Sequence, residues 1–364
     1  MTATAVAAMT RIVALSRYGR LGASSRARLF QYWPYLVARG IEVEACPFLP
    51  DDYLRLLYSK GTRSWRLSLE AYLRRFALLL RRRDYSLLWI EKEIFPWLPS
   101  WAEWLLARAH VPYIVDYDDA IFHNYDLNPR RLVRVCLGRK IDSVMRHAAL
   151  VTAGNDYLAD RARQAGAKRV EVIPTAIDLE RYTPRPRNEK DSFTIGWIGT
   201  PITSKYLTMV QSALEEACRH HNTRVALIGS GDVHLAGVRC SIRPWSEETE
   251  VEEIQALDVG IMPLPDTPWE RGKCAYKIVQ YMACSLPVVA SPVGMNREIV
   301  TDGANGFLAA TRGEWVASLE ALRKDSGLRR RMGHSGRIKA EKEYSLQVTA
   351  PKMHSIIQQI AGVA

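Results

Sequence analysis

The feature that most constrains this chain is an alternation, repeated in both halves, of short apolar runs with longer amphipathic stretches. The strands expected in the first half are 11–16, 41–45, 86–91, 112–116 and 150–153, with a helix over 24–38. Those expected in the second half are 193–198, 224–228, 259–263 and 287–290, with helices over 205–219, 251–257 and 273–283. Such alternation predicts βαβ units, and therefore parallel sheets in an α/β fold.

The length of 364 residues favours two domains over one. Three prolines, Pro174, Pro184 and Pro186, mark the best linker candidate, because proline disfavours helix in the residue before it. We expect a first Rossmann-like domain over residues 1–178, a linker over 179–191 and a second Rossmann-like domain over 192–343. A C-terminal helix is expected within 344–364.

The net charge of +11 lies mostly in the first half, which suits nucleic acid, an anionic membrane or anionic substrates. No nucleic-acid-binding motif is found, so no nucleic-acid partner is predicted. The six cysteines form no C-x-x-C pair, which favours a reducing compartment without structural zinc. No run reaches transmembrane length, and residues 1–10 lack the pattern of a signal peptide, so a cytoplasmic location is expected.

The most informative stretch for function is 258–291, where a Pro-rich loop follows a strand and Gly272 precedes a helix expected to begin near Lys273 or Cys274. A helix N-terminus beyond the end of a strand suits a diphosphate. Lys273 and Lys277, four residues apart, would share one face of this helix, with Gln280 near the same side. The alternative interpretation is an ordinary solvated helix face.

Three segments carry a family resemblance: 258–264 (DVGIMPL), the Lys277-x-x-Gln280 helix with its continuation YMACSLPVVAS, and 305–308 (NGFL). They resemble the family 4 glycosyltransferases of the bacterial cell-surface polysaccharide type. The resemblance implies the GT-B fold, in which two Rossmann-like domains face a cleft and the C-terminal helix crosses back to the first domain. It also implies retention of anomeric configuration.

The implied donor substrate is an NDP-sugar, with UDP or GDP as the nucleotide, and no cofactor or bound metal is expected. The implied acceptor is a hydroxyl of a saccharide or lipid-linked saccharide, in cell-surface polysaccharide or glycolipid biosynthesis. Three alternatives stay open: a sugar-nucleotide 2-epimerase of the same fold, a nucleic-acid-binding protein and a non-catalytic scaffold.

The resemblance also implies roles for single residues. Lys277 would contact the diphosphate, and Gln280 the ribose or the β-phosphate side. Many relatives carry two glutamates spaced E-x7-E, whereas here Gly272 and Gln280 occupy those places. Glu270 and Arg271 are therefore candidates for contacts to the donor sugar.

Two further segments support a donor site. The small-residue turn at Gly199 and Thr200 permits close approach of a ligand to the backbone, and Lys205 follows it with a charge suited to phosphate. Trp245 resembles the lining of a nucleobase pocket, and the alternative is a packed aromatic.

In the first half, a loop with Gly19, Gly22 and Arg26 follows the first strand and by resemblance faces the donor phosphates or the acceptor. Asp118 and Asp119 follow a later strand that also holds Asp116. Such crowding of acids raises a carboxylate pKa, and we expect Asp118 or Asp119 to orient or deprotonate the acceptor hydroxyl. Solvated turn formers are the alternative.

Two basic, aromatic segments, 72–83 and 95–104, complete the features of the first half. Tryptophan and arginine together suit the interface of an anionic membrane, which would place the protein peripherally at the inner face of the cytoplasmic membrane. Core aromatics beside a solvated arginine face are the alternative.

Overall fold

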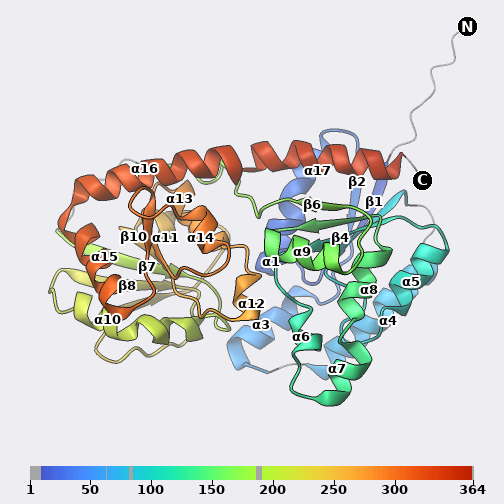
Figure 1. Ribbon diagram of the computed structural model, residues 1–364, viewed down its shortest axis with the longest axis horizontal. Coiled ribbons are helices and arrows are strands. Elements are labelled where there is room, and N and C mark those ends of the chain that lie inside the picture. The colour runs from blue at the N-terminus through green and yellow to red at the C-terminus, as the bar shows by residue number, and fades with distance from the viewer. Residues whose placement is uncertain (1–9, 63, 82–84, 186–190, 363–364) are drawn as a thin grey trace, which may run out of the picture. The chain divides into compact units, whose positions relative to one another are not determined.

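The computed structural model describes residues 10–62, 64–81, 85–185 and 191–362. The terminal residues 1–9, Arg82 and Arg83 of the basic segment, and residues 186–190 of the expected linker lie outside this range. The chain divides into two compact units, one comprising residues 1–174 with 349–364 and the other residues 175–348. Each unit is described by itself (Figure 1).

Unit 1 is built on a six-stranded parallel sheet in the order β2-β1-β3-β4-β5-β6. Its central strands β3 and β4 are buried throughout, as expected for apolar strands covered by helices on both faces. The strands are β1 (Arg11–Leu15), β2 (Glu42–Ala45), β3 (Leu87–Glu91), β4 (Tyr113–Tyr117), β5 (Leu150–Ala153) and β6 (Val170–Val172).

The helices of unit 1 are α1 (Ala23–Arg28), α2 (Trp33–Val37), α3 (Asp51–Lys60), α4 (Trp65–Arg81), α5 (Trp101–Arg108), α6 (His123–Asp126), α7 (Arg131–Leu137), α8 (Lys140–His147) and α9 (Asp156–Gln164), with the 3-10 turn η1 (Phe30–Tyr32). The prediction of a single helix over 24–38 is wrong. It is divided into α1, η1 and α2, with Pro34 in the first turn of α2, where a missing N–H is tolerated.

Unit 2 repeats the architecture with the strand order β12-β11-β10-β7-β8-β9, again entirely parallel. Its strands are β7 (Phe193–Ile198), β8 (Thr223–Ile228), β9 (Cys240–Arg243), β10 (Val259–Met262), β11 (Val288–Ala290) and β12 (Gly306–Leu308). Its helices are η2 (Ser204–Val210), α10 (Gln211–Ala217), α11 (Glu250–Gln255), α12 (Pro268–Arg271), α13 (Tyr276–Ala283), α14 (Asn296–Ile299), α15 (Arg312–Lys324) and α16 (Ser326–Glu343).

A glycine explains how closely α13 packs on the sheet of unit 2. A Cβ at Gly260 of β10 would lie 2.2 Å from Cδ2 of Tyr281 on α13, so only glycine fits there. The Tyr281 hydroxyl accepts a hydrogen bond from the backbone N–H of Ile198 at 3.0 Å. These contacts fix α13 beside the carboxyl end of β7.

The last helix, α17 (Leu346–Ala361), belongs to unit 1 from Thr349 onward, which confirms the predicted return of the C-terminal helix. The Tyr32 hydroxyl donates to Oγ1 of Thr349 at 3.1 Å, and Nη1 of Arg169 donates to Oε1 of Gln359 at 2.9 Å. Together the two sheets confirm the predicted α/β class with two Rossmann-like domains.

Candidate functional site

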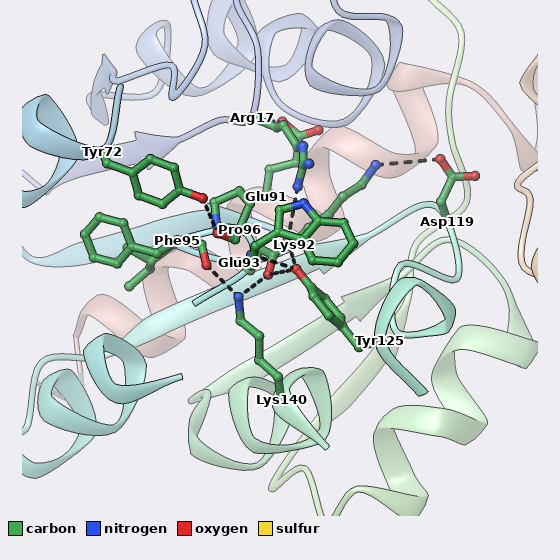
Figure 2. Close-up of polar contacts among 12 residues, drawn as sticks. Arg17, Tyr72, Glu91, Lys92, Glu93, Phe95, Pro96, Asp119, Tyr125 and Lys140 are labelled. Atoms are coloured by element: carbon green, nitrogen blue, oxygen red, sulfur yellow. Dashed lines mark hydrogen bonds and ion pairs between the residues drawn. The ribbon is translucent and has the colours of Figure 1, made fainter. Parts of the chain in front are cut away.

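Charged side chains gather at the carboxyl edge of the sheet in unit 1, where β1, β3 and β4 end (Figure 2). Ligands of open parallel sheets bind at this edge. Glu91 is the last residue of β3, and its neighbour in the register is Asp116 of β4. The side chains that follow these two strands therefore meet at one edge.

Glu93 is the centre of a buried cluster that the sequence analysis did not single out. The Tyr125 hydroxyl lies 2.9 Å from each carboxylate oxygen of Glu93, and Nη1 of Arg17 lies 3.1 Å from Oε1. Nζ of Lys140 donates to Oε2 (Figure 2). Burial, and then the Glu93 carboxylate, raise the pKa of Tyr125. Glu93 is thus held between two cations and a phenol that stays protonated.

Glu91 anchors the loop that follows β1. Its Oε2 accepts a hydrogen bond from the backbone N–H of Arg17 at 2.7 Å and from the Ser25 hydroxyl at 2.6 Å. Its Oε1 has no hydrogen-bond partner among the described residues. Burial raises the pKa of this carboxyl, although the charge of Lys92 opposes the change.

Lys92 joins the predicted acids Asp118 and Asp119. Its Nζ lies 2.9 Å from Oδ1 of Asp118 and 3.6 Å from Oδ2 of Asp119 (Figure 2 draws the second pair). The backbone of Lys92 has φ of 69°, in the left-handed region that a non-glycine residue adopts only at a cost.

The expectation of a raised carboxylate pKa at Asp118 is wrong. Burial does push its pKa upward, but the Lys92 ammonium and a hydrogen bond from Ser24 lower it more, so the net shift is downward. The sequence shows three acids close together and does not show the cation that neutralises them. Asp118 is therefore an ionised acceptor of hydrogen bonds.

Asp116, the third acid, has a structural role. Its carboxylate accepts hydrogen bonds from Nε and Nη2 of Arg28 at 2.9 and 2.7 Å, and from the Thr152 hydroxyl at 2.6 Å. Both partners of the ion pair are 1% exposed. This pair ties α1 to β4.

The loop with Gly19, Gly22 and Arg26 is shaped by contacts within the protein. A Cβ at Gly19 would lie 2.3 Å from Oδ1 of Asp51, and Gly22 is the N-terminal cap of α1. Arg26 is 6% exposed, and its Nη1 donates to the carbonyl of Arg20 at 3.1 Å. Arg17 of the same loop, rather than Arg26, reaches the Glu93 cluster.

In unit 2, the candidate donor site lies around the start of α13. This helix begins at Tyr276, after Ala275 in a left-handed conformation with φ of 51°. Lys273 therefore precedes the helix, and the expectation that it shares a helix face with Lys277 is wrong. Nζ of Lys277 lies 4.8 Å from the ring centroid of Trp197, near the end of β7.

Gln280 is buried, so the interpretation of α13 as a solvated face is wrong for this residue. Its Nε2 donates to the Tyr182 hydroxyl at 2.8 Å and lies 3.5 Å from Oε2 of Glu250. Glu250 also accepts hydrogen bonds from the Tyr182 hydroxyl at 2.6 Å and from Nε1 of Trp245 at 2.8 Å, and pairs with Arg181 at 2.8 Å. The half-buried Trp245 is thus held by a hydrogen bond at its indole nitrogen.

The loop before α13 contains the other predicted donor residues. Glu270 is 6% exposed and accepts hydrogen bonds from the hydroxyls of Tyr206 and Thr267. Arg271 is exposed and pairs with Asp266 at 2.6 Å. Gly272 is buried and caps the C-terminus of α12.

The turn after β7 lies next to this loop, because Tyr206 of η2 bonds to Glu270. The N–H of Gly199 donates to the carbonyl of Ile228 at 2.9 Å, and the N–H of Thr200 donates to Oγ1 of Thr203 at 3.2 Å. Lys205 is exposed beside Tyr206. Unit 2 therefore brings Lys205, Glu270 and Lys277 to neighbouring segments.

Within the described part of the chain, no group of three or more His, Cys, Asp and Glu side chains is arranged to hold a metal ion. The same residues include no helix that is both long and apolar enough to cross a membrane.

Two family models match the chain in succession. Residues 4–176 match the glycosyl transferase 4-like domain, and residues 192–325 match the glycosyl transferases group 1. The chain is a GT4-type glycosyltransferase. The matches cover both units, so the transferase assignment does not depend on one motif.

Individual relatives agree with this assignment. A D-inositol 3-phosphate glycosyltransferase of Xylanimonas cellulosilytica is 26% identical over 299 residues, which are 72% of this chain and 70% of the relative. The capsular polysaccharide biosynthesis glycosyltransferase CapM of Staphylococcus aureus is 23% identical over 175 residues, which are 46% of each chain.

A solved structure gives the fold. Anabaena Alr3699/HepE, crystallised with UDP and glucose, superposes with a TM-score of 0.70 at 16% identity, over 96% of this chain and all of that one. The predicted GT-B fold is confirmed for the glycosyltransferase. The sequence analysis missed Arg17, Glu93 and Lys140. Only Glu93 had a signal, because the charged run 91–93 ends a strongly apolar strand without a turn residue.

Proposed function

We propose that this glycosyltransferase moves a sugar from an NDP-sugar, most simply UDP-glucose, to a hydroxyl of a saccharide or lipid-linked saccharide. The observation that carries the proposal is the position of Lys277 in the first turn of α13, next to Trp197 at the end of β7. A cation and a helix N-terminus at the carboxyl edge of a parallel sheet suit a diphosphate. The crystallised complex of HepE with UDP and glucose supports the same donor class.

The donor site we propose neutralises the leaving diphosphate with protein cations and no metal ion. Lys277 would bind the phosphates, and Lys205 and Lys273 are additional cations near the same segment. Gln280 would position the ribose or β-phosphate side through its amide, which Tyr182 and Glu250 hold in place. Trp245 would border the nucleobase.

On the acceptor side, Asp118 and Asp119 would orient the attacking hydroxyl. Asp118 accepts hydrogen bonds but carries no proton to donate at neutral pH, because Lys92 keeps its pKa low. We infer transfer with retention: the bond from the anomeric carbon to the diphosphate oxygen breaks, and the bond to the acceptor oxygen forms on the same face. The acceptor proton passes to the leaving diphosphate, so Asp118 needs only to position the hydroxyl.

We further infer a role in cell-surface polysaccharide or glycolipid synthesis, with the enzyme in the cytoplasm at the inner face of the membrane. The similarity to CapM supports the polysaccharide product, and the similarity to the inositol phosphate enzyme supports a hydroxyl acceptor.

A thermal-shift screen of UDP-, GDP- and ADP-sugars tests the donor assignment, because a ligand that binds the folded state raises the apparent stability. We expect nucleotide-sugars of one nucleotide class to raise the midpoint temperature of unfolding. We also expect the sugar of that donor to be released or transferred. No shift with any nucleotide-sugar would overturn the proposal. Epimerisation at C2 of a UDP-sugar without an acceptor would replace it by a 2-epimerase.

A further inference from the structure

The exposed apolar side chains of unit 1 are concentrated on one part of its surface. More than half of the large apolar side chains that are exposed in the described residues lie between residues 65 and 105. We name the following set the α4–α5 face: Trp65, Leu69, Leu73, Phe76 and Leu80 of α4, with Trp97, Leu98, Trp101, Trp104 and Leu105 of α5 and the segment before it.

Helix α4 carries this surface as a continuous stripe. The spacings of four, four, three and four residues from Trp65 to Leu80 keep these side chains on one side of a helix. Trp65 is 70% exposed and Leu80 65% exposed. The opposite side is anchored in unit 1, where Nη2 of Arg75 donates to the carbonyls of Ser16 and Cys46 at 3.0 and 2.8 Å. The helix is therefore held in the unit through this opposite side, and its outer stripe stays largely exposed.

The two helices form one surface. The rings of Phe76 and Trp101 lie 6.3 Å apart, and those of Phe95 and Trp101 lie 5.4 Å apart. Figure 1 shows α4 and α5 as neighbours in unit 1. An exposed apolar surface this continuous on a soluble unit marks an interaction site.

Arginines line the α4–α5 face. The guanidinium of Arg66 lies 5.6 Å from the Trp65 ring centroid, and that of Arg108 lies 4.9 Å from the Trp104 centroid. Within the described residues, neither Arg66 nor Arg108 forms an ion pair with an acid. Glu103, the acid of α5, is buried, and its Oε1 accepts a hydrogen bond from the backbone N–H of Ile94 at 2.9 Å.

We propose that the α4–α5 face binds the surface of an anionic lipid bilayer. Tryptophan rings favour the headgroup depth, leucines enter the acyl boundary, and the neighbouring arginines meet lipid phosphates. Protein interfaces are also enriched in tryptophan and arginine, so the test separates the two partners by lipid charge: only binding to a bilayer depends on the anionic headgroup. The proposal extends the lipid-linked acceptor of the proposed function, and vesicle binding tests it without a donor or acceptor.

The test is co-sedimentation of the full chain with phosphatidylcholine vesicles, with and without about 30 mol% phosphatidylglycerol. One variant removes apolar surface (Trp65→Ser with Leu73→Ser), and a second reverses charge (Arg66→Glu). The matched control removes exposed apolar side chains from unit 2 (Met209→Ser with Ile242→Ser). Far-UV circular dichroism of each variant checks that it is folded.

We expect binding to the anionic vesicles, and at least about tenfold weaker binding for both α4 variants than for the control. Binding that ignores phosphatidylglycerol, or that survives both substitutions, would overturn the proposal. If light scattering shows a dimer, and only the apolar variant dissociates it, then the α4–α5 face contacts a second copy of the chain and not a bilayer. A wild type that binds none of the nucleotide-sugars would contradict the proposed function, and the vesicle result would stay interpretable because its folding check uses no nucleotide.

Discussion

Replacing Lys92 with methionine tests whether this lysine holds Asp118 in its ionised form. In the wild type, Nζ of Lys92 lies 2.9 Å from Oδ1 of Asp118, and the two side chains are 10% and 12% exposed. Methionine keeps most of the volume and removes the charge. Breaking a buried ion pair by removing one partner lowers the free energy of unfolding by about 3–5 kcal/mol.

The dependence of this loss on pH separates the charge effect from a packing effect. In the wild type, the lowered pKa of Asp118 gives stability that is present above its ordinary value and is lost as pH falls through the folded value. The Lys92 ammonium lowers the pKa of Asp118, so its removal raises that pKa. In the variant, burial raises the pKa of Asp118 without the opposing charge of Lys92. Acidification then protonates Asp118 and removes the unpaired buried charge, so the variant loses less stability than the wild type. The difference between wild type and variant should therefore shrink on acidification from neutral pH.

Urea unfolding followed by tryptophan fluorescence measures this difference at neutral pH and near the ordinary aspartate pKa. The matched control is Lys324→Met, whose lysine pairs with Glu320 at 3.0 Å but is 67% exposed. Such an exposed pair contributes less than about 1 kcal/mol. A loss for Lys92→Met that is equal at both pH values, or no larger than the control, would refute the assignment.

Three further predictions follow from the same contacts. Arg28→Met should lower the free energy of unfolding, measured in urea, by about 3–5 kcal/mol, because it leaves Asp116 buried without its cation. The control Arg55→Met breaks an exposed pair and should lower this free energy by less than about 1 kcal/mol. Equal losses for the two variants would contradict the prediction. Asp118→Asn should lower kcat in steady-state transfer assays with little change in the donor KM, since the carboxylate is assigned to the acceptor; a raised donor KM alone would argue otherwise. EDTA should leave the transfer rate unchanged, and full loss on chelation would exclude metal-free neutralisation of the diphosphate.

Much of the fold could be predicted because buried strands are nearly continuous apolar runs. The three unexpected strands, β6, β9 and β12, are short edge strands with half-exposed residues, so their sequences show no such run. Pro34 divides a helix whose apolar pattern continues past it, and the pattern alone did not reveal the break.

The site was harder to predict because its contacts join separate strands and helices. Lys92 meets Asp118 only because β3 and β4 are neighbours in the register that pairs Glu91 with Asp116. Gln280 is held by Glu250, thirty residues away on another helix. Spacing along the chain identified the acids and α13, but only the tertiary structure shows which cations and acids face them.

The central claim is that Lys277 binds the phosphates of a nucleotide-sugar, and calorimetric titration of UDP into Lys277→Ala tests it most directly. The control is Lys342→Ala, on α16 outside the candidate site. A charge-assisted hydrogen bond contributes about 1.5–3 kcal/mol, so the predicted affinity of Lys277→Ala for UDP is about ten- to a hundredfold lower than that of wild type, with the control unchanged. Equal UDP affinity for both variants and the wild type would contradict the claim.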